Sequence, residues 1–388
     1  MNAANPHRSS LLTLFSIVIL DLVGFGIVIP ILPYYAREYG ASATVLGLIL
    51  TSYAAMQFTC APLWGRLSDR IGRRPVMLMT IAGTSLALFL LGFADSLVWL
   101  FVARLLGGAF GANVSVATAY VTDLTPEHER TRWMGLIGAS FGIGFILGPA
   151  IGGALAPYGH AVPMHFAGGL AAVNFLFALV ALREPPRHQV DAVAPSASRL
   201  QLPQDRLVRR LCIAYFLFCL GVNQLESVFA FFMMDRFAYD ARRVAYILVL
   251  MGLVMAAIQG GAIRGLAARF GERRLMIAGA VLLAASFVVI PWIPLVGVLL
   301  VPLLISSVGR AISQPAMLSM VSSAARAEHR GAVLGTFQSS ASLARVLGPL
   351  AAGALYDFHF GAPFVLAAVL MVLVFGFGVA LPGTGEAG

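Results

Sequence analysis

The stretch Gly65 to Arg74, with the sequence GRLSDRIGRR, lies between two long apolar segments and holds four arginines and one aspartate. A related stretch, Leu266 to Arg274 (LAARFGERR), occupies the matching place in the second half of the chain. A charged hairpin that recurs once per half indicates a duplicated bundle of membrane helices. It also predicts a role for this loop in both copies.

The composition indicates an integral membrane protein. Of 388 residues, 59% are hydrophobic and 11% are charged, and the mean hydropathy is +0.88. A soluble domain has roughly 25% charged residues, so this chain has too few to cover a water-facing surface. The net charge of +9 does not indicate nucleic-acid binding, because the arginines fall at the ends of apolar segments and form no single patch.

Several functional classes are excluded by missing motifs. The chain has no lysine, which excludes a Walker A loop and ATP-driven transport. The glycines between Gly142 and Gly148 lie in an apolar helix without a preceding strand, unlike a dinucleotide loop. The three cysteines and seven histidines show no metal-ligand spacing, and no helix has a nucleophile–base array. We therefore expect no metal, no cofactor and no enzymatic activity. We also expect no cleavable signal peptide.

The fold class expected is an all-α membrane protein with twelve transmembrane helices in two six-helix pseudo-repeats. A helix that spans the bilayer needs about 20 apolar residues. Twelve runs meet this requirement, at approximately Leu11–Pro33, Thr44–Trp64, Pro75–Phe93, Leu97–Val121, Trp133–Ala156, Met164–Leu182, Leu207–Met234, Val244–Ile263, Leu275–Trp292, Leu295–Val321, Ala332–Tyr356 and Ala362–Leu381.

The longest polar stretch divides the chain. Residues 1–183 are predicted to form an N-terminal six-helix bundle and residues 207–388 a C-terminal one, with a cytoplasmic linker at 184–206. Most of the 26 arginines fall on the linker's side of the membrane. Because positive loops stay in the cytoplasm, both termini are expected there. Gly148-Pro149 matches Gly348-Pro349, which further supports a duplicated secondary transporter with its site between the halves.

These features resemble the major facilitator superfamily over nearly the whole chain. Gly65–Arg74 resembles the loop between its helices 2 and 3, and Arg104 with Gly107, Gly108 and Gly111 resembles its helix 4 motif. Asp21, Gly26, Pro30 and Pro33 resemble the tetracycline and multidrug efflux branch. The helix 5 motif of proton-driven exporters is matched at Gly144, Gly148, Pro149, Gly152 and Gly153.

Asp21, Glu226 and Arg104 are the candidate proton-coupling residues. Asp21 lies about ten residues into helix 1, near mid-membrane, where apolar surroundings favour the protonated carboxyl group. The alternative is an aspartate held by backbone groups of a neighbouring helix. Glu226 is the second embedded acid, unless the outer vestibule merely hydrates it. The resemblance implies that Arg104 interacts with the protonatable acid; bonding to helix-end carbonyls is the alternative.

The candidate substrate cavity combines polar and aromatic side chains of several helices. Asn223 and Glu226 share one helix face, as do Arg310 and Gln314. Arg345, which shares a face with Gln338 and Ser342, partners an embedded acid or an anionic group of the substrate. A purely structural or lipid-facing role is the alternative for each aromatic. The complete set is Asn113, Asn223, Gln224, Arg310, Gln314, Gln338, Arg345, Phe25 and Phe229.

The hairpin is interpreted as a gating loop. The resemblance implies that Asp123 lies near the arginines, where it and Asp69 would pair with them across the cytoplasmic interface of the halves. Ala268 and Ser323 replace these acids in the second half, so the latch is expected to be one-sided. The alternative is a basic loop that only sets orientation. The candidate residues are Gly65, Asp69, Arg70, Gly72, Arg73 and Asp123.

We therefore expect a monomeric transporter in a bacterial inner membrane, surrounded by lipid. It would export a small hydrophobic or amphipathic compound in exchange for protons, by rocking its two halves. The compound would be drug-like, with the tetracyclines among the candidates. The alternatives are a proton symporter or facilitator for a polar metabolite and, with less support, a non-transporting receptor of the same fold.

Overall fold

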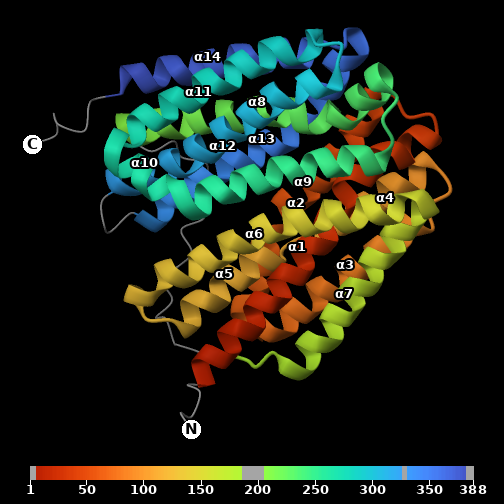
Figure 1. Ribbon diagram of the computed structural model, residues 1–388. Helices are drawn as coiled ribbons and strands as arrows, with labels where there is room; N and C mark the ends of the chain where they lie inside the picture. Colours follow the sequence, from red (N-terminus) through yellow and green to blue (C-terminus); the bar gives the residue numbers. More distant parts are fainter. Residues whose placement is uncertain (1–5, 186–204, 326–329, 382–388) are drawn as a thin grey trace, which may run out of the picture. The chain divides into compact units, whose positions relative to one another are not determined.

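The computed structural model describes residues 6–185, 205–325 and 330–381, which form helices joined by short connections (Figure 1). No strand occurs within these ranges. The elements are α1 Pro6–Glu38, α2 Ala43–Ile71, α3 Arg73–Gly92, α4 Leu97–Phe110, α5 Asn113–Leu124, α6 Glu127–Leu155, η1 Ala156–Tyr158, α7 Ala161–Ala181, α8 Arg206–Phe237, α9 Ala241–Ala257, η2 Ile258–Ala262, α10 Ile263–Phe270, α11 Glu272–Val289, η3 Ile290–Trp292, α12 Val296–Ala324, α13 Arg330–Phe358 and α14 Ala362–Ala380.

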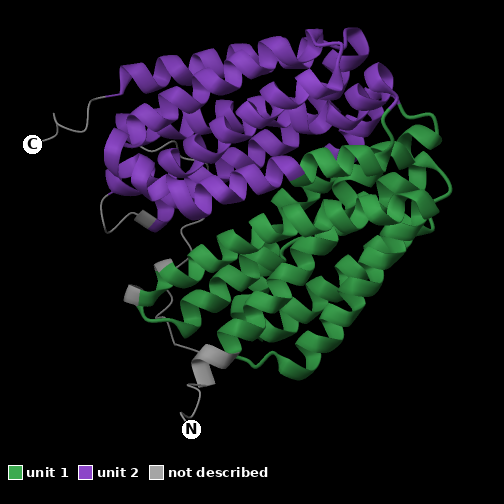
Figure 2. Cartoon of the chain, in the orientation of Figure 1, with its two compact units in different colours: residues 1–41, 52–195, 239–249 green, residues 42–51, 196–238, 250–388 purple. Residues whose placement is uncertain are grey.

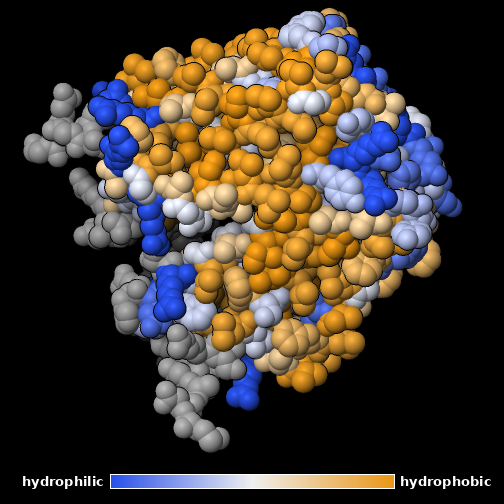
Figure 3. All heavy atoms as spheres, viewed as in Figure 1, coloured by the Kyte–Doolittle hydropathy of each residue, from blue (hydrophilic) through white to orange (hydrophobic). Residues whose placement is uncertain are grey.

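Eleven spans in the described part of the chain are long and apolar enough to cross a membrane. The expected eleventh helix in chain order, α13, is 29 residues long but is not among them. Polar residues such as Gln338, Ser342 and Arg345 lower its hydropathy. Hydrophobic residues cover most of the surface seen in Figure 3, and hydrophilic residues gather near the helix ends. The predicted all-helical membrane fold is confirmed.

Helices 4 and 8 of the predicted set are not continuous α-helices. The fourth is interrupted at Gly111 and Ala112, between α4 and α5. The eighth passes through the π-helical turn η2 between α9 and α10. Such breaks have no hydropathy signature, because Gly and Ala are ordinary in membrane helices. Both predicted spans are nevertheless present, at Leu97–Leu124 and Ala241–Phe270, and only their local helical geometry is irregular.

The chain forms two compact units (Figure 2). Unit 1 comprises residues 1–41, 52–195 and 239–249, and unit 2 comprises residues 42–51, 196–238 and 250–388. The expected division into 1–183 and 207–388 stays a prediction. Residues 186–204 of the expected linker lie outside the described residues.

The same helix packing occurs in each unit. In unit 1, α1 packs against α6 and α7, and α3 packs against α4 and α7. In unit 2, α8 packs against α13 and α14, and α11 packs against α12 and α14. These pairs occupy matching places in the two sequence halves, so the structure reproduces the repeat that the sequence pattern indicates.

The beginning of α2 belongs to unit 2, where an acid caps it. The Asp357 carboxylate accepts hydrogen bonds from the backbone N of Ala43 at 3.0 Å and of Thr44 at 2.8 Å, and from Thr44 Oγ1 at 2.6 Å. The first N–H groups of a helix have no partner within the helix. Asp357 therefore fixes the start of α2 to the last turn of α13.

Candidate functional site

The turn between α2 and α3 is much tighter than the sequence predicts. The predicted loop began after Trp64, but α2 continues to Ile71 and α3 begins at Arg73, leaving only Gly72 outside the helices. Gly72 has φ 110° and ψ 159°, a conformation essentially restricted to glycine. The expected hairpin loop is thus corrected to a one-residue turn, and most of its charged side chains project from helices.

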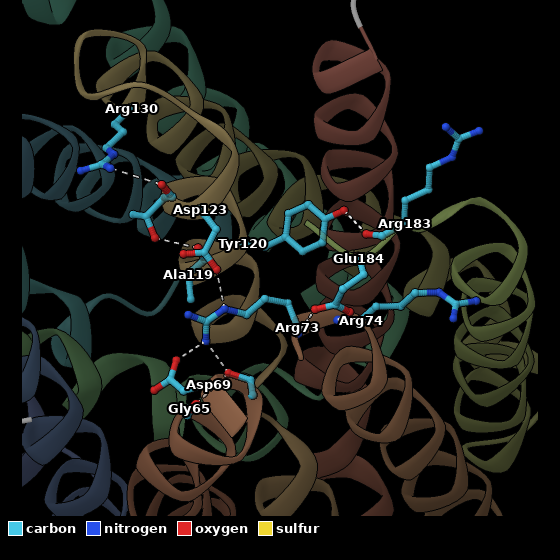
Figure 4. Close-up of polar contacts among 12 residues, drawn as sticks. Gly65, Asp69, Arg73, Arg74, Ala119, Tyr120, Asp123, Arg130, Arg183 and Glu184 are labelled. Atoms are coloured by element: carbon cyan, nitrogen blue, oxygen red, sulfur yellow. Dashed lines mark hydrogen bonds and ion pairs between the residues drawn. The ribbon is translucent and has the colours of Figure 1, made fainter. Parts of the chain in front are cut away.

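Glu184 closes this turn. Its carboxylate accepts hydrogen bonds from the backbone N of Arg73 at 2.7 Å and of Arg74 at 2.9 Å (Figure 4). A negative charge at a helix N-terminus is stabilising because the first amides are free and the helix dipole is positive there. A Cβ at Gly72 would lie 2.6 Å from Glu184 Oε1. Glycine therefore also makes room for the cap.

Arg73 joins the two candidate acids of the gating loop. Its Nη1 lies 2.6 Å from an oxygen of Asp69, and its Nε donates to Asp123 Oδ2 at 2.7 Å. Nη1 also donates to Ser68 Oγ at 2.6 Å. Figure 4 shows the guanidinium between the ends of α2 and α5. Both ion pairs lie within unit 1, and pairing across the halves stays a prediction.

The other two hairpin candidates have minor places in this cluster. The Gly65 carbonyl accepts a hydrogen bond from Ser68 Oγ at 2.7 Å. A Cβ at Gly65 would meet nothing within 4 Å, so the described packing does not require glycine there. Arg70 is exposed on the last turn of α2.

The second copy of the turn keeps one arginine contact and loses another. Arg74 donates to the carbonyls of Leu182 at 2.8 Å and Leu179 at 2.7 Å, at the end of α7. Its counterpart Arg273 donates at 2.9 and 2.6 Å to carbonyls near the end of α14. The counterpart of Arg73 is Glu272, however, which accepts a hydrogen bond from a serine. The two turns therefore carry opposite charges at this position.

Asp21 is hydrogen-bonded at the break in the fourth membrane span. Asn113, the first residue of α5, donates from Nδ2 to Asp21 Oδ1 at 2.6 Å. Asn113 is 3% exposed, and its own Oδ1 has no hydrogen-bond partner in the described structure. A predicted cavity residue thus holds a predicted proton-coupling residue. Among the described residues, the hydrogen bond to this carboxylate comes from a side-chain amide and not from the backbone groups of the structural alternative.

Arg104 is buried beside an aromatic group. Its guanidinium carbon lies 4.0 Å from the centre of the Tyr53 ring, and its Nε has no hydrogen-bond partner among the described residues. Phe25 contacts the same tyrosine, with ring centres 5.7 Å apart, and meets Phe145 edge-on. The expected interaction of Arg104 with Asp21 is not an ion pair within the described residues. A cation–π contact takes its place.

The glycines of the helix 5 motif bring α6 against α1 beside Asp21. A Cβ at Gly148 would lie 2.4 Å from Gly26 Cα, and one at Gly144 would lie 2.7 Å from Leu22 Cβ. A Cβ at Gly152 would lie 2.8 Å from the Ile27 carbonyl oxygen. Small residues permit such backbone approach between membrane helices.

The motif's remaining residues extend this packing along α6. Pro149 lies inside the helix without ending it. A Cβ at Gly153 would lie 2.5 Å from Ala245 Cβ, in the part of α9 that belongs to unit 1. The motif therefore packs within unit 1.

In unit 2, Glu226 and Arg310 form an ion pair through a hydrogen bond from Nη1 to Oε1. Gln314, one turn further along α12, donates to the Tyr215 hydroxyl at 3.4 Å. Arg345 donates to Ser342 Oγ at 3.1 Å. The structure thus brings together the predicted acid of α8 with the predicted polar face of α12.

Three other cavity candidates have packing roles within unit 2. Gln224 is completely buried, and its Nε2 donates to the carbonyls of Leu220 and Gly348 at 3.2 and 3.4 Å. Asn223 donates to the Cys219 carbonyl at 2.8 Å. Phe229 is 3% exposed. Gln338, in contrast, is exposed on α13.

Two residues at these sites were not among the predicted candidates: Glu184 and Tyr215. Glu184 precedes two prolines at the start of the expected linker. Tyr215 lies in an apolar run. A search for acids near a helix N-terminus would not have found Glu184, because it reaches α3 from the far end of α7.

The family model of the Major Facilitator Superfamily matches residues 14–265 and 262–384. The chain belongs to the major facilitator superfamily. It is 34% identical over 340 residues to the class D tetracycline resistance protein of Salmonella ordonez, which covers 86% of each chain. It is 27% identical over 384 residues to multidrug resistance protein 2 of Bacillus subtilis (strain 168), covering 96% of this chain and 95% of that one.

Solved structures show the same fold. The human organic anion transporter MFSD10 (TETRAN) is 29% identical, with a TM-score of 0.73 and coverage of 96% of this chain and all of that chain. A bacterial homolog of the human lysosomal transporter Spinster has a TM-score of 0.79 at 15% identity, covering 97% of each chain. The protein is a multi-pass membrane transporter of this superfamily and not an enzyme.

Proposed function

We propose that the protein is a proton-coupled antiporter that exports a small hydrophobic or amphipathic compound from bacteria across the inner membrane. The observation that carries this proposal is the embedded Asp21 carboxylate, held by Asn113 at 2.6 Å beside the glycine crossing of α1 and α6. Similarity to tetracycline and multidrug resistance proteins supports drug-like substrates. We propose a monomer with cytoplasmic termini that uses neither ATP nor a cofactor.

In this proposal Asp21 alternates between a protonated and a charged state as the transporter alternates its access. A ligand changes a conformational equilibrium only by its differential affinity for the two states. The hydrogen bond that Asn113 donates favours the charged carboxylate, whereas apolar surroundings favour the protonated one. Rearrangement at the α4–α5 break would change the balance between these two effects and so couple proton release to conformation.

The test is transport in proteoliposomes with an imposed pH gradient, using tetracycline and a panel of lipophilic dyes. The wild type should accumulate substrate in the compartment from which protons leave. Asp21→Asn should abolish this gradient-driven accumulation while retaining substrate binding. The matched control is Asp95→Asn, which removes an exposed acid between α3 and α4.

Two outcomes contradict the proposal. Undiminished proton-driven accumulation in Asp21→Asn would exclude this residue as the coupling site. Accumulation in the same direction as proton flow would instead indicate a symporter, the alternative for which no residue of the described site provides specific support.

A further inference from the structure

Arg345 is a charged side chain in the middle of a membrane helix, and the described part of the chain offers it no charged partner. It is residue 16 of the 29 residues of α13 and is exposed. Its guanidinium donates to Ser342 Oγ at 3.1 Å. No carboxylate of the described chain forms an ion pair with it. One neutral hydroxyl leaves most of its five N–H donors available.

A position facing lipid does not suit Arg345. Arginine at the centre of a membrane helix costs about 3 kcal/mol even on the insertion scales that give low values, and such residues face a bundle interior or a water-filled cavity. The same face of α13 carries Gln338 and Ser342, at helical spacings of seven and three residues from it. This face of unit 2 is therefore polar over two turns, as expected for the lining of an aqueous path.

Glu226, the embedded acid of α8, is already paired. Glu226 accepts from Arg310, and the pair contributes no net charge. Arg345 lies close enough to Tyr215 and Cys219 to interact electrostatically with both, and Glu226 likewise lies near Cys219. The cluster of Glu226, Arg310 and Arg345 therefore carries a net charge of +1.

Buried aromatic rings hold the cluster in place. Tyr215 and Phe337 stack with ring centres 3.9 Å apart and planes 7° apart, and both rings are nearly inaccessible. Tyr215 belongs to α8 and Phe337 to α13, so the stack fixes these two helices against each other. Gln314 adds α12 through the Tyr215 hydroxyl. The charges consequently project from three mutually fixed helices.

We propose that Arg345 binds an anionic group, a carboxylate or sulfonate, of the transported compound. Ser342 and Gln338 supply neutral hydrogen bonds beside it, and the Glu226–Arg310 pair keeps the local charge at +1. The planar guanidinium is suited to two parallel hydrogen bonds with a carboxylate. This inference rests on the proposed function and narrows its substrate to amphipathic anions and zwitterions.

The experiment uses two dyes with one xanthene ring system, fluorescein as an anion and rhodamine 6G as a cation. Binding to purified full-length protein in detergent is measured by fluorescence polarisation at pH 7.5, without a pH gradient. Loss of charged hydrogen bonds should weaken fluorescein binding to Arg345→Gln about tenfold to a hundredfold. Rhodamine 6G should bind this variant as well as or better than the wild type.

Two further variants separate charge from structure. Arg345→Lys keeps the charge but loses the planar pair of donors, so its fluorescein affinity should lie between those of the wild type and Arg345→Gln. Glu226→Gln raises the local charge to +2 and should bind fluorescein more tightly than the wild type does. A merely structural Arg345 would not produce this order of affinities, and unchanged melting temperatures would confirm intact folding.

The proposal is overturned if Arg345→Gln binds fluorescein as the wild type does, if it weakens both dyes equally, or if the wild type prefers the cation. Failure of the wild type to bind fluorescein also overturns it. None of these results depends on proton coupling. Conversely, proton-driven transport that survives Asp21→Asn overturns the proposed function and leaves the anion site intact.

Discussion

The turn at Gly72 allows a strict test of the cap that Glu184 forms on α3, because the chain contains a matched turn at Gly271. Both glycines are single residues between two helices, with φ, ψ of 110°, 159° and 79°, 153°. A Cβ at Gly271 would meet nothing within 4 Å, whereas one at Gly72 would lie 2.6 and 3.0 Å from the two Glu184 oxygens. Alanine thus strains both backbones but displaces a carboxylate at only one.

The expected magnitudes follow from these two contributions. A non-glycine residue in this backbone region costs about 1–3 kcal/mol, which applies to both Gly72→Ala and Gly271→Ala. Loss of a helix N-cap costs about 0.5–2 kcal/mol more, which applies only to Gly72→Ala. The excess should stay in the lower part of that range, because Glu184 is exposed.

Equilibrium unfolding in mixed detergent–SDS micelles measures both variants in two backgrounds. In the wild type, Gly72→Ala should be less stable than Gly271→Ala. In Glu184→Ala, the two glycine substitutions should cost the same apart from the difference in their φ angles, because the cap is already absent. Equal costs in the wild type, or an excess that persists without Glu184, would refute the steric reasoning.

Three further predictions concern single contacts. Asp123→Asn should reduce thermal stability more than Asp69→Asn, because side-chain exposures of 28% and 62% give the buried pair less solvent screening; equal melting temperatures would contradict this. Gly148→Ala should cost about 1–3 kcal/mol by overpacking against α1, whereas Gly142→Ala, with open space around it, should be neutral in the same unfolding assay. Burial raises the pKa of Asp357, but hydrogen bonds from the start of α2 lower it more, so its pKa lies below the ordinary 3.8. The stability that these hydrogen bonds contribute is therefore complete above pH 3.8 and is lost as the pH falls through the lowered pKa of Asp357. Asp357→Asn should consequently lower the melting temperature at pH 7 and have little effect near pH 2.

Hydropathy was sufficient to predict the helices because the bilayer imposes a length and an apolar composition on each of them. It could not place their ends, since a helix continues into water wherever its polar residues permit. The extension of α2 to Ile71 is such a case. The break at Gly111 and Ala112 was also invisible, because these residues are ordinary in apolar membrane helices.

The sequence also identified most charged residues of the sites, because an embedded charge stands out against an apolar background. Their partners were less predictable. Arg104 contacts the Tyr53 ring and not an acid, and Gln224 bonds to helix carbonyls. Residue type gives a side chain's hydrogen-bonding capacity, but only tertiary packing determines which group lies within 3 Å of it. Long-range partners such as Glu184 were therefore missed.

The contacts of matching glycines show that the two embedded acids are not duplicates of each other. Gly148 of α6 meets Gly26 of α1, and its counterpart Gly348 of α13 meets Asn223 of α8, so Asn223 is the structural equivalent of Gly26. Asp21 precedes Gly26 by five residues, whereas Glu226 follows Asn223 by three. At about 1.5 Å per residue, the acids differ by about 12 Å along equivalent helices.

The two acids also differ in what holds them. The acid of the first repeat is held by an amide at a helix break. The acid of the second is neutralised by Arg310 within a rigid three-helix cluster, which leaves Arg345 as the available charge. Duplication provided two equivalent bundles, and divergence placed the amide-held acid Asp21 in one and the cation of Arg345 in the other. In the proposed antiport, the proton and the transported compound would therefore bind to different repeats.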